Sequence, residues 1–121
     1  AWDAPLVMTR PNKFGMGEIF GNQENFEKYQ ITKLLEKQAA ALRDSHRLIL
    51  LGIGNFRDQH EQAHALLNKL KIPLVYRDGP VRKHDWHSGW VAESVELLFK
   101  AANSLTNPQV DSPSRCDPSH D

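Results

Sequence analysis

Two short apolar runs flank one amphipathic segment, and this arrangement constrains the fold more than any other feature of the sequence. Residues 47–54 and 72–76 are apolar runs of strand length, which is typical of strands buried on both faces of a parallel sheet. Residues 59–71 between them repeat apolar side chains at helical spacing, as with Ala63 and Leu67. Strand, helix, strand is a βαβ unit, and such units are almost always right-handed. The sequence therefore predicts two adjacent parallel strands joined by a helix.

Two further segments have the periodicity of amphipathic helices. Residues 26–43 form one of them, and residues 89–102, with Ser88 as the expected N-cap, form the other. In the second helix one face carries the apolar side chains that we expect to be buried, which are Val91, Val95, Leu98, Phe99 and Ala102. Residues 1–25 have no clear period and are rich in glycine and proline, so we expect loops and short turns there. Because only two strong strands are visible, we expect this chain to be part of a larger domain or to pair with a second copy.

Length and charge exclude several classes of function. The 121 residues amount to about one domain, and the 15 basic side chains balance the 15 acidic ones. A neutral balance gives no electrostatic reason to bind nucleic acid. No apolar run approaches the roughly 18 residues of a membrane span. No signal peptide is visible and Cys116 is the single cysteine, which excludes an internal disulfide and favours a cytoplasmic location.

The C-terminal tail differs in composition from the rest. Residues 107–121 hold three prolines among serine and aspartate side chains. Such a segment cannot bury enough apolar surface to order itself. We therefore expect a folded part over residues 1–106 and a disordered tail over 107–121.

A histidine stands where the second predicted strand gives way to a helix. The strand ends near Tyr76, the chain turns through residues 78–80, and His84 follows in a loop before the helix. A loop histidine is well placed for proton transfer, because its ordinary pKa is close to neutral. His84 is followed by Asp85 and Trp86, and this three-residue sequence resembles part of a known protein family.

The segment around His84 resembles the C-terminal part of the putative esterase family of α/β-hydrolases, which includes S-formylglutathione hydrolases, enterochelin esterases and mycolyltransferases. The similar features are Ile72-Pro73, the turn at residues 78–80 and the sequence His84-Asp85-Trp86, in a match that covers roughly residues 14–102. The resemblance implies a partial three-layer α/β-hydrolase fold with parallel strands and flanking helices. It also implies a serine-type carboxylic-ester hydrolase or acyltransferase that acts on a small-molecule ester without a cofactor.

The same resemblance implies roles for three residues. His84 matches the base of the catalytic triad, and the position of the triad acid falls on Asn55. Asp58 is the nearest carboxylate, so it is either the acid after a shift of the loop or the N-cap of the following helix, and the cap is the interpretation we favour. A Gly-x-Ser-x-Gly elbow should precede these residues, but the chain contains none. We therefore expect no ester hydrolysis by the chain alone.

Two alternatives remain open at this stage. His60-Glu61-Gln-Ala-His64 matches the H-E-x-x-H signature of zinc metallopeptidases. The i, i+4 spacing would place both imidazoles on one helix face, with Glu61 as base and His84, Glu93 or Glu96 as candidate third ligands. The interpretation that we favour for this motif is a solvated helix edge that binds no metal. The other alternative is a non-catalytic α/β remnant that binds a partner.

Overall fold

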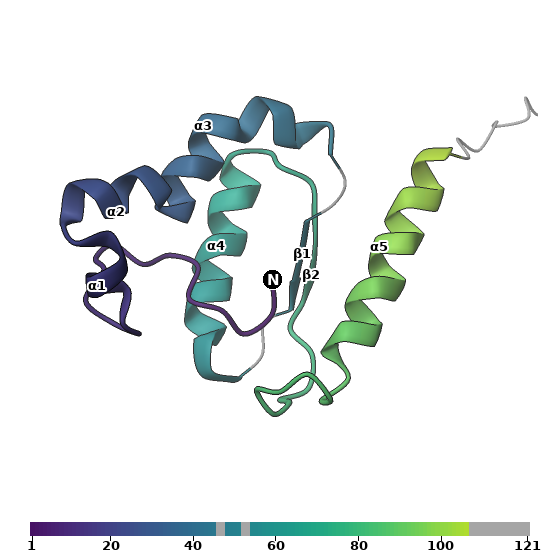
Figure 1. The fold of residues 1–121 in the computed structure, drawn as a ribbon. Coiled ribbons are helices and arrows are strands. Elements are labelled where there is room, and N and C mark those ends of the chain that lie inside the picture. The colour runs from purple at the N-terminus through teal and green to yellow at the C-terminus, as the bar shows by residue number, and fades with distance from the viewer. Residues whose placement is uncertain (46–47, 52–53, 107–121) are drawn as a thin grey trace, which may run out of the picture.

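The computed structural model describes residues 1–45, 48–51 and 54–106 (Figure 1). These residues form helices and two strands. The elements are, in order, α1 (Met16–Phe20), α2 (Gln23–Tyr29), α3 (Ile31–Arg43), β1 (Leu48–Leu51), the 3-10 helix η1 (Gly54–Phe56), α4 (Arg57–Lys69), β2 (Leu74–Arg77) and α5 (Trp90–Thr106). The expected disorder of residues 107–121 concerns a segment outside the described residues.

The predicted βαβ unit is confirmed. Strands β1 and β2 are parallel neighbours, with Leu48 paired to Leu74 and Leu51 paired to Arg77, and α4 connects them. A third segment aligns with them, because Trp2 forms a parallel bridge with Leu51. The Leu51 backbone N–H donates to the carbonyl oxygen of Ala1 at 2.9 Å. Three stretches of chain therefore run in parallel. Strand β1 lies in the middle, with the N-terminal stretch on one side of it and β2 on the other.

The expected three-layer α/β-hydrolase fold is wrong. The described part of the chain is mostly helical, and its sheet contains two strands. The sequence before β1 forms α1, α2 and α3, and the N-terminal stretch adds only an isolated bridge at Trp2. The βαβ pattern specifies how two strands connect, but it does not specify how many strands complete the sheet.

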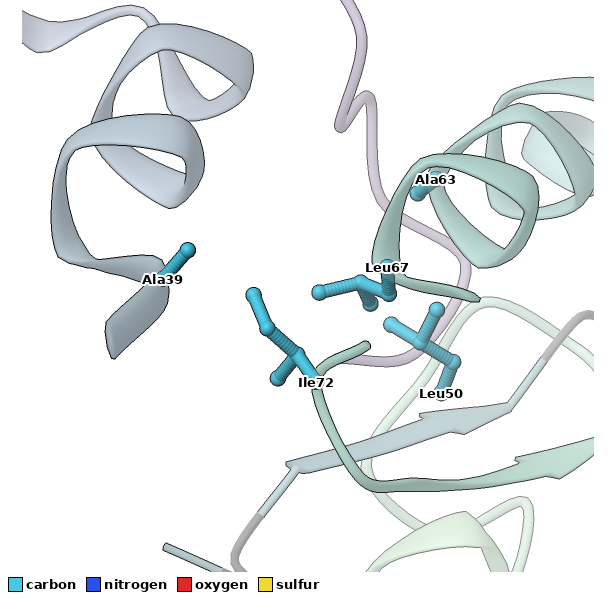
Figure 2. Close-up of a cluster of buried hydrophobic side chains, with 5 residues drawn as sticks. All are labelled: Ala39, Leu50, Ala63, Leu67 and Ile72. Atoms are coloured by element: carbon cyan, nitrogen blue, oxygen red, sulfur yellow. The ribbon is translucent and has the colours of Figure 1, made fainter. Parts of the chain in front are cut away.

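The first hydrophobic cluster lies between the sheet and the helices α3 and α4. It joins side chains from α3, β1 and α4 and from Ile72, which directly precedes β2. Its buried members are Ala39, Leu50, Ala63, Leu67 and Ile72, and Figure 2 shows their side chains converging. Burial of such side chains is the main favourable contribution to folding, at about 25 cal/mol per Å² of apolar surface.

The second cluster lies on the opposite face of β1. Its buried members are Trp2, Ile49 and Leu51, and Trp90 and Leu97 from α5 pack against them. Successive side chains of a strand point to opposite faces, so Leu50 faces α4 whereas Ile49 and Leu51 face α5. Figure 1 shows α4 and α5 on opposite sides of the strands. The short sheet is thus covered by helices on both faces.

Two helices differ from their predicted form. The helix expected over residues 26–43 is broken at Gln30, which has an extended backbone and donates its side-chain amide to the Met8 carbonyl at 2.9 Å. In α5 the expected buried stripe faces solvent at Val95 and Leu98, and Phe99 is 66% exposed. The side chains that face the sheet are Trp90 and Leu97 instead.

Candidate functional site

Two residues that are far apart in the sequence form the centre of the candidate site. Asp3 follows the bridge at Trp2, and His84 lies in the loop after β2. The His84 Nδ1 atom lies 2.9 Å from Asp3 Oδ2. Asp3 is only 1% exposed, whereas the His84 ring is partly open to solvent. Because the ends of parallel strands meet at one edge of a sheet, the topology brings these two side chains together.

The Asp3 carboxylate is fixed by two further hydrogen bonds. The Phe56 backbone N–H donates to Oδ1 at 2.8 Å, and the Asn55 side-chain amide donates to Oδ2 at 3.3 Å. The Asp3 backbone has φ 39°, in the left-handed region where aspartate is more frequent than most residues. Hydrogen bonds to both carboxylate oxygens satisfy this buried group and hold it in one orientation. The structure thus provides a preorganised acceptor against the imidazole.

The Asp3 carboxylate also determines which nitrogen of His84 is free. A carboxylate only accepts hydrogen bonds, so the Nδ1 atom of His84 must carry a hydrogen and donate a hydrogen bond to Asp3. In the neutral ring the Nε2 atom then carries the lone pair. An imidazole oriented by a carboxylate in this way is the arrangement of a general base.

A row of stacked rings leads away from His84. Trp2 stacks on His84 with the ring centroids 4.9 Å apart, and Trp90 stacks on Trp2 at 4.9 Å with the ring planes 3° apart. Trp86 follows at 5.4 Å from Trp90. The Trp90 indole N–H donates to the Asp85 carbonyl at 3.1 Å, which anchors this end of the row. Such stacking restricts the imidazole to one orientation.

An open cavity of about 1000 Å³ adjoins the Asp3–His84 pair. Its wall is predominantly apolar, with a few polar groups. The lining residues are Trp2, Asp3, Ala4, Pro5, Phe14, Met16, Asn55, Phe56, His84, Asp85, Trp86 and Trp90. A large apolar cavity with a few convergent polar groups is the usual form of a small-molecule site.

Of the three site residues predicted from the sequence, the structure brings two together at Asp3 and leaves the third apart. His84 and Asn55 come together because both bind the Asp3 carboxylate. Asp58 is exposed in the first turn of α4, and within the described residues its side chain has no hydrogen-bond partner. It is therefore neither the acid nor the expected cap, because α4 begins at Arg57 and its N-cap residue is Phe56.

Asp3 is the residue of the candidate site that could not be recognised in the sequence. The stretch that carries it, Ala1 to Ala4, is too short to show a strand period. An aspartate near an irregular N-terminal segment has no motif that distinguishes it from a surface residue. Only the alignment of Trp2 with Leu51 reveals its position beside the loop of His84.

The geometry of the H-E-x-x-H motif does not support a zinc site. His60 is fully buried, and its Nε2 atom accepts the Ala4 backbone N–H at 2.9 Å, so this lone pair is occupied. The interpretation as a solvated edge is wrong for His60, whose burial lowers its pKa below the ordinary value. His64 stacks on Tyr76 with the centroids 4.2 Å apart. Across residues 1–45, 48–51 and 54–106, no group of three His, Cys, Asp or Glu side chains could hold a metal ion.

Comparisons with known proteins give no assignment. No protein-family model, no curated protein and no solved structure matches this chain. Among the described residues, no helix combines the length and apolar character needed to cross a membrane.

Proposed function

We propose that this chain supplies the general base of a carboxylic-ester hydrolase, with His84 as the base and Asp3 as the carboxylate that orients it. The observation that carries the proposal is the 2.9 Å contact between His84 Nδ1 and the buried Asp3 carboxylate, at the wall of an apolar cavity. The resemblance of residues 72–86 to the putative esterase family supports the same class of reaction. Asn55 takes the role of a residue that positions Asp3.

The reaction uses His84 twice. A hydroxyl nucleophile attacks the ester carbonyl carbon while Nε2 takes its proton, and the Asp3 carboxylate stabilises the resulting imidazolium. The bond to the alcohol oxygen breaks, and the proton passes from Nε2 to the departing alkoxide. Water then attacks the acyl group, gives its proton to Nε2, and the nucleophile leaves with that proton. Ester and water thus become acid and alcohol, and the imidazole returns to its neutral form.

The nucleophile must come from outside the described residues. Within them, no hydroxyl or thiol lies within hydrogen-bonding distance of the His84 ring, and the Ser88 hydroxyl donates to the Asp85 carbonyl at 3.0 Å. We expect it from a polypeptide segment other than these 121 residues. A base without a nucleophile beside it has no alkoxide to generate, so the complete protein is the proper sample for a test.

Hydrolysis of p-nitrophenyl butyrate by the protein expressed from its complete reading frame tests the proposal. His84→Ala and Asp3→Asn should each lower kcat/KM by roughly 10²-fold or more, as loss of a general base or its orienting acid does. His87→Ala is the matched control, because His87 is an exposed ring in the same loop. An inactive protein, or a His84→Ala variant as active as the control, would refute the proposal.

A further inference from the structure

We infer that the cavity beside His84 binds a quaternary alkylammonium group, carried by the acyl or the alcohol part of the substrate. This inference rests on the proposed function for the placement of the ester, but not for the binding of the cation. It is drawn from the charges and the aromatic rings that line the cavity.

The charges of the cavity wall favour a cation. Asp3 and Asp85 contribute carboxylates, whereas no lysine or arginine is among the described residues that line the cavity. The nearby guanidinium of Arg82 is paired with Glu93 at 2.6 Å. Within the described part of the chain, the ion pair of Asp3 is with His84, which is charged only when protonated. With neutral His84 the wall is therefore anionic, and it would repel an anionic ligand.

The aromatic rings provide the second part of such a site. Five rings line the cavity, from Trp2, Phe14, Phe56, Trp86 and Trp90. The faces of aromatic rings attract cations, most strongly in tryptophan, and cages of such rings recognise quaternary ammonium ligands. A neutral alkyl group would gain only the hydrophobic part of this interaction, because it lacks the attraction to ring faces and carboxylates.

Trp86 is the ring best placed to contact a ligand. It is 74% exposed although it lines the cavity, and its neighbour in the sequence is the exposed carboxylate of Asp85. Its ring is therefore accessible to a ligand in the cavity, which the rings covered by other side chains are not. Trp2, in contrast, is buried and stacked between His84 and Trp90 in the row of rings, which makes it a supporting residue.

Tryptophan fluorescence reports on this cavity alone, because the three tryptophans of the chain all line it. Choline and its neutral isostere 3,3-dimethylbutan-1-ol are the probes, titrated into the 121-residue chain. Choline should change the emission saturably and bind about tenfold more tightly than the isostere. Trp86→Ala should weaken choline binding by about tenfold, Trp86→Phe should restore part of it, and Asp85→Asn should weaken it several-fold. Asp58→Asn, an exposed carboxylate outside the cavity, is the matched control.

The outcomes separate this inference from the proposed function. Equal binding of choline and the isostere, or Asp85→Asn and Trp86→Ala variants that bind choline like the control, would overturn the cation site. Choline binding that survives in His84→Ala supports the site independently of catalysis. If the complete protein hydrolyses a nitrophenyl ester through His84 but the chain does not bind choline, the proposed function stands and this inference falls.

Discussion

His84 Nδ1 and Asp3 Oδ2 lie 2.9 Å apart, although 81 positions of the sequence separate them. The βαβ unit delivers His84 to the edge of the sheet, and the bridge between Trp2 and Leu51 delivers Asp3 to the same edge. Phe56, the last residue of η1 and the N-cap residue of α4, contributes the backbone N–H that fixes the carboxylate. The candidate site is therefore a consequence of three parallel segments that end together.

The first prediction concerns the tautomer of His84. Neutral His84 should carry its proton on Nδ1, because the Asp3 carboxylate accepts it. Asp3→Asn should shift the ring toward the Nε2-protonated form, since an amide can also donate to Nδ1. Long-range ¹H–¹⁵N correlation spectra of the two imidazole nitrogens measure this ratio. A wild-type ring protonated on Nε2 would contradict the assigned hydrogen bond.

The second prediction uses two adjacent leucines of α5. Leu97 packs against the second cluster, whereas Leu98 is exposed. Leu97→Ala should lower the free energy of unfolding by about 2–3 kcal/mol because it leaves a cavity, and Leu98→Ala by less than about 1 kcal/mol. Urea unfolding followed by circular dichroism gives both values. A larger loss at Leu98 would show that α5 packs through the originally predicted stripe.

The same helix shows why sequence reasoning succeeded only in part. The βαβ unit was predictable because apolar runs and a helical period are local signals. The stripe through Val95 and Leu98 is also a real period, but the period does not reveal which tertiary surface is available to cover it. The sheet presents Ile49 and Leu51 to α5, and Trp90 and Leu97 are the side chains that meet them.

The candidate site shows the same limit. His84 and Asn55 could be proposed because each follows a predicted strand, and parallel strands end at a common edge. Asp3 could not, because it follows a single bridge rather than a strand of detectable length. The sequence therefore left the acid open between Asn55, at the matched position, and Asp58, the nearest carboxylate, which was more readily explained as a helix cap. The structure places the Asp58 side chain in solvent.

The third prediction follows from that exposed position. Asp58→Ala should change the free energy of unfolding by no more than about 0.5 kcal/mol, because the side chain caps no helix and contacts no partner among the described residues. Asp3→Ala should cost about 1–3 kcal/mol, since it leaves the Phe56 N–H buried without its acceptor. Thermal or urea unfolding of the two variants compares them directly. An Asp58 variant as unstable as the Asp3 variant would restore the cap interpretation.

The fourth prediction concerns catalysis by the 121-residue chain alone. It should hydrolyse p-nitrophenyl butyrate no faster than its His84→Ala variant, because no described hydroxyl or thiol lies beside the imidazole. Initial rates at equal protein concentration, measured at pH 7.5, make the comparison. A His84-dependent rate in this sample would show that the chain already contains its nucleophile.

The last prediction concerns pH and His60. Burial lowers the pKa of His60 in the folded protein below its ordinary value of 6.5, and its Nε2 atom accepts the Ala4 N–H, which requires the neutral ring. As the pH falls through 6.5 the unfolded chain therefore binds a proton at this residue and the folded chain does not. Below pH 6.5 the free energy of unfolding should therefore decrease as the pH falls, by at most about 1.4 kcal/mol per pH unit from this residue. Above pH 6.5 the contribution of His60 should be constant.

His60→Gln isolates this contribution to the pH dependence. Glutamine places an acceptor near the position of Nε2 and does not titrate, so other groups contribute equally to both proteins and cancel in the difference. The stability of the wild type minus that of the variant should rise with pH up to about 6.5 and then stay constant. Urea unfolding at half-unit steps between about pH 5 and pH 8 measures this difference. A difference that does not vary with pH would mean that His60 titrates alike in the folded and unfolded chain, contrary to its burial.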